Sequence, residues 1–328
     1  MSTQTNGPVW LDVLATGYPS LDYIFRVSRS PGLDETAIVY QLPEGYTFGG
    51  CGANVAVGLA RLGLCAGVAM VVGDDPAGRA YTRYLAERGV DTADVQVWPD
   101  AATSQSRLFI NPDGDYQNFF HPGASDAWQG ELVLKNLSRS RTALLTVGAP
   151  HYNRAFVDRV LEAGVPLIWQ LKSDVYSYPP EQLDRLARKS TLLIMNRVEA
   201  NYLAEELEVA HARRLLRDDV QLIVITCGTA GSLVIDADGE HEVPVVEPRQ
   251  ACPGPGVVDP TGAGDGYTTG FLAGWLRGFP SHVCGRMGAT LASFVVEKVG
   301  CQTNLPDWTS LASRYLEHFG EPLPTLLD

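Results

Sequence analysis

The segment "DPTGAGDGYTTG", residues 259–270, places glycines, aspartates and a proline directly before an apolar helical run. Glycines allow a turn to expose consecutive backbone N–H groups at a helix start, where the positive end of the helix dipole lies behind them. Gly262, Ala263 and Gly264 therefore predict an anion-binding nest at the beginning of this helix.

Asp265 follows this nest within the first turn of the same helix. A carboxylate would repel a bound anion there unless it takes part in the chemistry or caps the helix. As a general base it would accept the proton of a substrate hydroxyl while that hydroxyl attacks a phosphoryl group held by the nest. As a cap it would only stabilise the helix, and Asp265 taken alone leaves both readings open.

The same helix carries glycine at every fourth position: Gly266, Gly270, Gly274 and Gly278. Residues four apart lie on one helix face, so these glycines form a face without side chains. We expect a neighbouring element to pack closely against it.

The net charge excludes some classes of partner. The chain has 25 Lys and Arg against 38 Asp and Glu, a formal charge of −13, which repels polyanions, so no nucleic-acid partner is expected. An anionic small ligand would need a local device such as the predicted nest. With no tract of eighteen apolar residues, no association with a membrane is expected either.

The first ten residues lack a basic region followed by an apolar one, so no secretory signal is expected. The cysteines are widely spaced and form no C-x-x-C motif: Cys51, Cys65, Cys227, Cys252, Cys284 and Cys301. Such cysteines indicate thiols of a cytoplasmic protein rather than disulfides or a zinc site.

Short apolar runs alternate with helical patterns along the chain. Strands are expected at 10–16, 67–73, 142–148, 166–171, 191–196 and 221–226, and helices at 53–62, 78–88, 154–163, 180–189 and 199–207. Continuous apolar strands are typical of a parallel sheet covered by helices on both faces. The pattern predicts a doubly wound α/β sandwich.

Two segments, 36–50 and 104–125, interrupt this rhythm and read as antiparallel strands, each forming an inserted hairpin. We therefore predict one domain over 1–328, with strands of a small β lid inserted at about 17–50 and 95–125. Inserted strands of this kind suit a lid or a dimer surface, so a homodimer through the lid is a hypothesis.

Two long motifs resemble the ribokinase-like, or PfkB, family of carbohydrate and nucleoside kinases. "DPTGAGDGYTTGF" is similar to that family's D-T-x-G-A-G-D, and "GGCGANVAVGLARLG" (49–63) is similar to its G-G-x-x-x-N-x-A-x-x-x-A-x-L-G. The motifs lie in the family's order, about 200 residues apart. The resemblance implies a three-layer α/β/α sandwich with a mostly parallel central sheet and a small β-sheet lid. It also implies an ATP-dependent kinase with Asp265 as catalytic base.

On the acceptor side, the resemblance implies that Asp22, Gly49, Gly50 and Asn54 bind substrate. The two glycines permit close backbone approach to a polyol, and Asn54 offers both a donor and an acceptor to hydroxyls. An ordinary turn and a helix cap remain the alternative reading of the glycine pair and its neighbours.

On the nucleotide side, "NRVEA" (196–200) fits the family's N-x-x-E and "TCGTAGSLV" (226–234) its nucleotide-binding turn. The resemblance implies ATP contacts by five residues: Asn196, Glu199, Thr226, Gly228 and Gly231. It further implies Mg²⁺ organised by Glu199 through water, and a monovalent cation, K⁺, near Asp259. Taken singly, these residues could equally be a solvated helix residue, a strand end and a tight turn.

The acceptor remains open at this stage. Asp22 and Asn54 suit vicinal hydroxyls, which favours phosphoryl transfer to the hydroxymethyl group of a small sugar. "WQLKSDV" (169–175) departs from the Asp-x-Asn-x-Arg run of many sugar kinases of the family, notably at Lys172. A nucleoside kinase and a non-catalytic sugar- or nucleotide-binding protein are the alternatives. The dinucleotide fingerprint and the Walker A motif are absent from the sequence.

Overall fold

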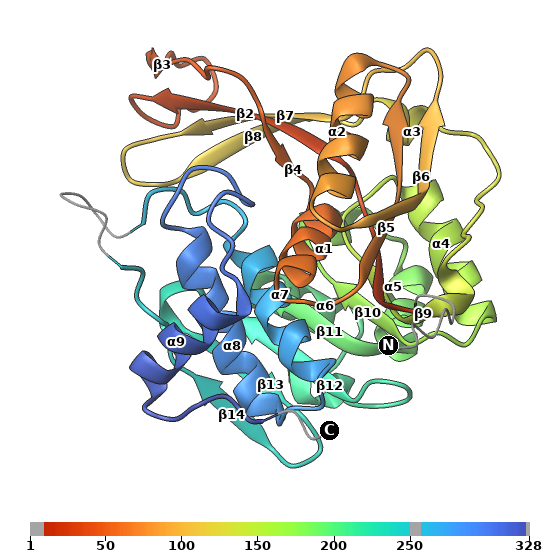
Figure 1. Ribbon diagram of the computed structural model, residues 1–328, viewed down its shortest axis with the longest axis vertical. Coiled ribbons are helices and arrows are strands. Elements are labelled where there is room, and N and C mark those ends of the chain that lie inside the picture. The colour runs from red at the N-terminus through yellow and green to blue at the C-terminus, as the bar shows by residue number, and fades with distance from the viewer. Residues whose placement is uncertain (1–9, 250–256, 326–328) are drawn as a thin grey trace, which may run out of the picture.

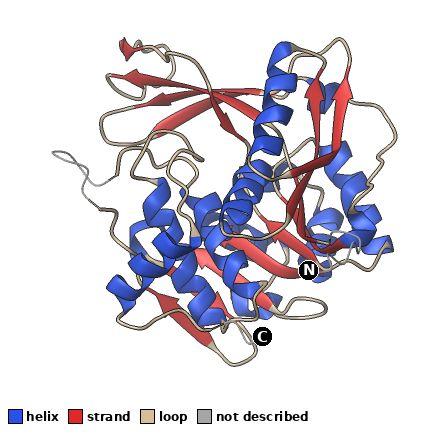
Figure 2. Ribbon diagram, in the orientation of Figure 1, coloured by secondary structure: helices blue, strands red, loops and turns tan. Residues whose placement is uncertain are grey.

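A nine-stranded sheet forms the centre of the computed structural model, which describes residues 10–249 and 257–325. Its strand order is β14-β13-β12-β11-β10-β9-β1-β5-β6. Figure 1 labels most of these strands, and Figure 2 shows strands in red and helices in blue. The strands are β1 (Leu11–Thr16), β5 (Ala66–Gly73), β6 (Asp91–Trp98), β9 (Ser140–Leu145), β10 (Leu167–Gln170), β11 (Ser190–Asn196), β12 (Leu222–Thr226), β13 (Ser232–Ile235) and β14 (Glu240–Val243). Neighbouring strands from β6 to β12 pair in parallel, and β13 and β14 extend that edge in antiparallel pairing.

Helices cover both faces of this sheet because its strands are apolar on both sides. Val13 of β1 faces one buried cluster and Leu14 the other. The first cluster contains side chains of α1 (Cys51–Arg61), α2 (Pro76–Glu87), α7 (Ala263–Trp275), α8 (Ser281–Val295) and α9 (Trp308–Phe319). The second contains those of α3 (Ala124–Ala127), α4 (Pro150–Glu162), α5 (Pro180–Lys189) and α6 (Arg197–Glu206). The predicted three-layer sandwich is confirmed.

The chain builds the sheet outward in two directions. From β1 it adds β5 and β6 on one side, and then β9 to β12 on the other. In open α/β sheets, ligands bind outside the carboxyl ends of the strands where the direction reverses.

A second sheet of five strands projects from the main body (Figure 1). Its order is β3-β2-β7-β8, with β4 also paired to β2. The strands are β2 (Ser20–Val27), β3 (Val39–Gln41), β4 (Thr47–Gly49), β7 (Gln105–Ile110) and β8 (Tyr116–His121). We call this sheet the lid.

The lid differs from the expected pair of hairpins in two respects. Segment 36–50 forms β3 and β4, which each pair antiparallel with β2 rather than with one another. Residues 95–98, which we placed with the lid, belong to β6 and pair in parallel with β5 of the main sheet. Periodicity identifies strands, but their partners depend on tertiary contacts. Within the described residues, no helix is long and apolar enough to cross a membrane.

Candidate active site

Gly262 begins the site, because it turns the chain into α7. Its φ of 78° lies in the left-handed region that favours glycine, and a Cβ atom there would lie 2.7 Å from Cys301 Sγ. The next residues, Ala263 and Gly264, open α7 and line a cavity. The predicted nest residues therefore lie together at a helix N-terminus that faces open space.

The glycine row of α7 packs against α8. A Cβ atom on Gly266 would lie 2.8 Å from a Val295 methyl group, and one on Gly270 would lie 2.4 Å from a backbone oxygen of α8. Gly274 is equally restricted, whereas Gly278 follows the helix at φ 75° and meets nothing within 4 Å. The expected close packing is confirmed for the first three glycines, and Gly278 instead serves the turn that follows α7.

Asp265 is the third residue of α7 and is only 3% exposed. Asn54 Nδ2 of α1 donates to Oδ2 over 2.8 Å, and Gln170 Nε2 at the end of β10 donates to Oδ1 over 2.8 Å. The carboxylate is thus held from both sides by amides. Gln302 Nε2 donates in turn to Asn54 Oδ1 over 2.8 Å, which fixes the orientation of that amide.

Lys172, two residues beyond β10, contacts the same carboxylate. Its Nζ lies 3.0 Å from Asp265 Oδ1, and 28% of the lysine side chain is exposed. Burial alone would raise the pKa of Asp265, but the charge of Lys172 and hydrogen bonds from Asn54, Lys172 and Gln170 outweigh burial and lower it. Asp265 is therefore ionised and able to accept a proton at neutral pH.

Asp22 lies on β2, the lid strand that connects directly to the main sheet. It is 8% exposed and accepts a hydrogen bond from Ser20 Oγ, which is also 3.1 Å from Ser106 Oγ. Burial raises the pKa of Asp22 to about 6 against these hydrogen bonds, and the charges of Asp259 and Asp265 add to the rise. A buried carboxylate with neutral hydroxyl donors can accept hydrogen bonds from ligand hydroxyls.

Gly49 and Gly50 bring the main chain against Asp22. A Cβ atom on Gly49 would lie 2.0 Å from Asp22 Oδ2, and one on Gly50, at φ 99°, would lie 2.3 Å from the backbone oxygen of Tyr18. Tyr81 Oη donates to the Gly49 carbonyl over 2.6 Å. The glycine pair is therefore required by close approach. Asn54 follows on α1 and is buried beside Asp265.

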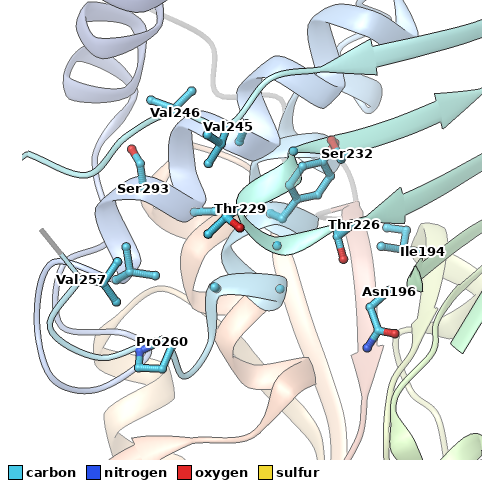
Figure 3. A pocket seen from close by; sticks show the side chains of 18 of the residues that line it. Ile194, Asn196, Thr226, Thr229, Ser232, Val245, Val246, Val257, Pro260 and Ser293 are labelled. Carbon is cyan, nitrogen blue, oxygen red and sulfur yellow. The ribbon is translucent and has the colours of Figure 1, made fainter. Parts of the chain in front are cut away.

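A cavity lies against the α7 N-terminus, lined there by Ala263 and Gly264. Its volume of about 700 Å³ is typical of small-molecule sites. Its lining includes the ends of β11 and β12, where Asn196 and Thr226 are register partners. Figure 3 shows these two side chains at neighbouring strand ends, with Thr229 beyond them and Ser293 on the opposite wall. The lining joins the α7 N-terminus, the strand ends and α8 around one space.

Asn196 and Glu199 form a capping box at the start of α6. Asn196 Oδ1 accepts from the Glu199 backbone over 2.9 Å, and Glu199 Oε2 accepts from the Asn196 backbone over 2.7 Å. Burial raises the pKa of Glu199, opposed by this hydrogen bond and by Lys172. The Glu199 side chain is buried and lines the cavity, so it is more than a solvated helix residue.

The turn after β12 also faces the cavity. Gly228 has φ 59° and Gly231 has φ 84°, and both line the space. A Cβ atom on Gly231 would lie 2.2 Å from the Val243 carbonyl, whereas one on Gly228 would meet nothing within 4 Å. The turn therefore needs glycine at 231 for packing as well as for backbone conformation.

Asp259 is fully buried and braces the loop before α7. Its Oδ1 accepts from Thr261 N and Oγ1 over 3.0 and 2.5 Å, and its Oδ2 accepts from Gly300 N over 2.9 Å. Within the described residues, no group of three or more His, Cys, Asp or Glu side chains is arranged to hold a metal ion.

Sequence reasoning did not assign Gln170, Lys172 and Gln302 to the site. Gln170 Oε1 is buried and has no hydrogen-bond partner among residues 10–249 and 257–325, so it can accept a hydrogen bond from a ligand. The available signal was position: Gln170 ends a buried strand of a parallel sheet, at the edge where such folds bind ligands. Gln302 lies in the segment between α8 and α9 and carried no such signal.

Comparison with solved structures defines the class of protein first. The crystal structure of the Methanocaldococcus jannaschii nucleoside kinase, described as an archaeal member of the ribokinase family, aligns with a TM-score of 0.81 and 27% identity over 94% of this chain and 99% of that one. The Burkholderia thailandensis nucleoside kinase in complex with inosine aligns with a TM-score of 0.83 and 23% identity over 94% and 98%. The fold is that of the ribokinase-like kinases.

Sequence comparison then gives the family. The model of the pfkB family carbohydrate kinases matches residues 12–308, and the curated M. jannaschii nucleoside kinase is 30% identical over 307 residues, 93% of this chain and 97% of that protein. The chain belongs to the PfkB family of carbohydrate kinases. It is an ATP-dependent phosphotransferase with an alcohol group of a sugar or nucleoside as acceptor.

Proposed function

We propose that the protein transfers the γ-phosphoryl group of ATP to the hydroxymethyl group of a nucleoside. The choice of acceptor rests on the inner face of the lid. Asp22 of β2, Ser106 of β7 and Phe120 of β8 are register partners, so their side chains project to one face. An aromatic ring on the same face as a buried carboxylate, two strands away, suits a ligand that joins a base to a ribose. The nucleoside kinases among the relatives support the same choice.

In the proposed reaction Asp265 accepts the hydroxymethyl proton as the oxygen attacks the γ-phosphorus. The bond from that phosphorus to the bridging oxygen breaks, and ADP leaves. The amides of Asn54 and Gln170 keep the carboxylate oriented. The backbone at the α7 N-terminus stabilises the negative charge of the phosphoryl group through Gly262, Ala263 and Gly264.

Asp22 accepts hydrogen bonds from the ribose hydroxyls, and the Gly49–Gly50 main chain brings the sugar close to it. A phosphorylated sugar is less well supported as acceptor. Arg26 lies on the same lid face as Asp22, but its guanidinium donates to the Val258 carbonyl over 3.2 Å. The exposed Arg29 is paired with Glu35, and Arg107 lies over the Tyr23 ring on the opposite face of the lid.

ATP occupies the cavity in this proposal, with contacts from Asn196, Thr226, Gly228 and Gly231. Glu199 suits Mg²⁺, because a carboxylate oxygen is a ligand type this ion prefers and the ion usually keeps several waters. Bound Mg²⁺ neutralises phosphate charge. Removal of Mg²⁺ with a chelator should abolish ADP formation and leave the circular dichroism spectrum unchanged.

Three further proposals concern a monovalent cation, which the family resemblance implies, the oligomeric state and the cellular location. A K⁺ ion near Asp259 would stabilise the loop before α7, and equal activity in potassium, sodium and cation-free buffer would contradict this.

The lid presents Phe25, Phe109 and Phe119 on its outer face, in contact with one another. This supports a homodimer through the lid, which light scattering would test. We further propose that the enzyme acts in the cytoplasm.

The acceptor test compares inosine, adenosine and cytidine with ribose and fructose in a coupled ADP assay containing ATP and Mg²⁺. We expect at least one nucleoside to exceed ribose by about 100-fold in kcat/KM, since roughly 3 kcal/mol of base contacts is lost with the free sugar. Phe120→Ala should lower kcat/KM for the nucleoside and leave ribose unaffected.

Equal efficiency for ribose and nucleosides would instead identify a sugar kinase. Calorimetric binding of ATP and nucleoside without ADP release from any acceptor would identify a non-catalytic binding protein.

A further inference from the structure

The cavity proposed for ATP has very little positive charge. Among its described lining residues Lys172 is the only lysine or arginine, while Glu199 and Glu247 are acidic. The protein as a whole carries a formal charge of −13. A polyphosphate at this site therefore depends on local positive charge, and one side chain supplies it.

Lys172 lies where that charge would be needed. Its Nζ is 3.0 Å from Asp265 Oδ1, and a Cβ atom built on Gly264 would lie 3.4 Å from the same nitrogen. The ammonium group thus contacts the carboxylate and lies close to the backbone of Gly264. Because Lys172 also lines the cavity, its charge lies between the cavity and Asp265.

Lys172 is not needed to orient Asp265. Asn54 already donates to Oδ2 and Gln170 to Oδ1, and both amides come from regular elements or their ends. A third donor with a full charge, on a partly exposed side chain, adds little to positioning. The arrangement is better explained by a second partner that the lysine acquires during the reaction.

We propose that Lys172 is a catalytic residue that binds the γ-phosphoryl group and stabilises its charge during transfer, exchanging its contact with Asp265 for one with the phosphoryl oxygens. This inference rests on the proposed phosphoryl transfer and adds a residue to it. Lys172 forms no covalent bond and keeps its proton. The acceptor proton goes to Asp265, and the bond from phosphorus to the ADP oxygen breaks as the bond from phosphorus to the acceptor oxygen forms.

The exchange also activates the base. Burial disfavours the charged lysine, but Asp265 outweighs burial and raises the pKa of Lys172, so the ammonium stays protonated. The same pair lowers the pKa of Asp265 and makes it a weaker base in the free enzyme. When the ammonium turns to the phosphoryl group, Asp265 loses that stabilisation and becomes more basic as the nucleotide arrives.

Three substitutions separate charge from positioning. Lys172→Met removes both the charge and the donor, Lys172→Gln keeps a donor for Asp265 without the charge, and Lys172→Arg keeps the charge. We expect kcat to fall about 10²- to 10³-fold for Met and Gln alike, as for loss of one preorganised transition-state contact. Arg should retain more activity than either, and KM for the acceptor should change little.

The matched control is Lys189→Met, which removes a surface lysine paired with Asp219 and should leave kcat unchanged. Thermal midpoints establish that each variant is folded. If Lys172→Met does not fold, Lys172→Gln carries the test, because it preserves the contact with Asp265. A folded Lys172→Gln with kcat within threefold of wild type would overturn the inference, as would Arg being no better than Gln.

The two proposals fail in distinguishable ways. Wild-type protein that releases no ADP with any acceptor overturns the proposed function and, with it, the role of Lys172. Wild-type turnover together with active Lys172→Met and Lys172→Gln variants overturns the role of Lys172 alone.

Discussion

The main sheet and the lid each place a buried aspartate at the site, Asp265 and Asp22, and their electrostatic surroundings are opposite. On the main-sheet side Asp265 faces Lys172 and two amide donors, which lower its pKa in spite of burial. On the lid side Asp22 has hydroxyl donors, and burial raises its pKa to about 6. These surroundings suit the two aspartates to the two proposed tasks: accepting a proton during chemistry and accepting hydrogen bonds during binding.

The scaffolds of the two sides differ as well. Asp265 lies on a helix packed tightly against α8, and its partners come from α1 and the end of β10. Asp22 lies on β2, where the chain passes from the main sheet into a five-stranded lid. We infer that catalysis depends on the main-sheet side and acceptor recognition on the lid side. The predictions below test this division.

The largest effect should follow from Asp265→Asn. Asparagine preserves the shape but removes the proton acceptor, and general-base catalysis contributes about 10²- to 10⁴-fold, so kcat for ADP release should fall by that factor. Circular dichroism should be unchanged. Asp34→Asn is the matched control, since Asp34 is exposed and its positive φ of 61° is tolerated by asparagine. If Asp265→Asn retains most of its activity, Asp265 is not the general base and catalysis cannot be assigned to the main-sheet side.

A smaller effect is expected from Asp22→Asn. Loss of charged hydrogen bonds to the acceptor should lower kcat/KM for the acceptor about 10- to 100-fold, through KM, and leave KM for ATP unchanged. The readout is a steady-state titration of each substrate. If kcat at saturating acceptor falls as far as it does for Asp265→Asn, the lid carboxylate takes part in the chemistry and the two sides are not separate.

The same substitution should change stability with pH. Because the folded pKa of Asp22 is raised to about 6, the folded protein binds the proton more tightly than the unfolded chain. Proton binding by Asp22 therefore contributes to the free energy of unfolding. This contribution is fully present below about pH 4 and is lost as pH rises through 6. The free energy of unfolding of Asp22→Asn, measured with urea, should equal that of wild type at pH 4 and exceed it by on the order of 2 kcal/mol at pH 7. A constant difference across this range would contradict the raised pKa.

The smallest effect concerns the nucleotide turn on the main-sheet side. Gly231→Ala and Gly228→Ala share the cost of a positive φ, but only at 231 would the added methyl lie 2.2 Å from a backbone oxygen. We expect KM for ATP to rise about 3- to 10-fold for Gly231→Ala, a cost of roughly 1 kcal/mol, and less for Gly228→Ala. Equal effects would show that backbone conformation alone, and not close packing, makes glycine necessary at 231.

Much of the fold was predictable because the signals are local. Apolar runs identified the main-sheet strands, and helical periodicity identified the helices that cover the sheet. The glycine row of α7 indicated close helix packing, although the sequence did not show which helix packs there. Strand partners in the lid were not predictable. Segment 36–50 reads as a hairpin, yet both of its strands pair with β2, because pairing depends on contacts distant in sequence.

For the site, residue type and spacing by themselves determined the nest, the carboxylate after it and the glycine pair before α1, since a turn and a helix start are encoded within a few residues. Only the tertiary structure decided the electrostatics. Gln170 and Lys172 reach Asp265 across 95 and 93 positions of chain, and Gln302 reaches Asn54 across 248. A pKa depends on burial and on charges nearby in space, so the opposite character of Asp22 and Asp265 arises only once the chain has folded.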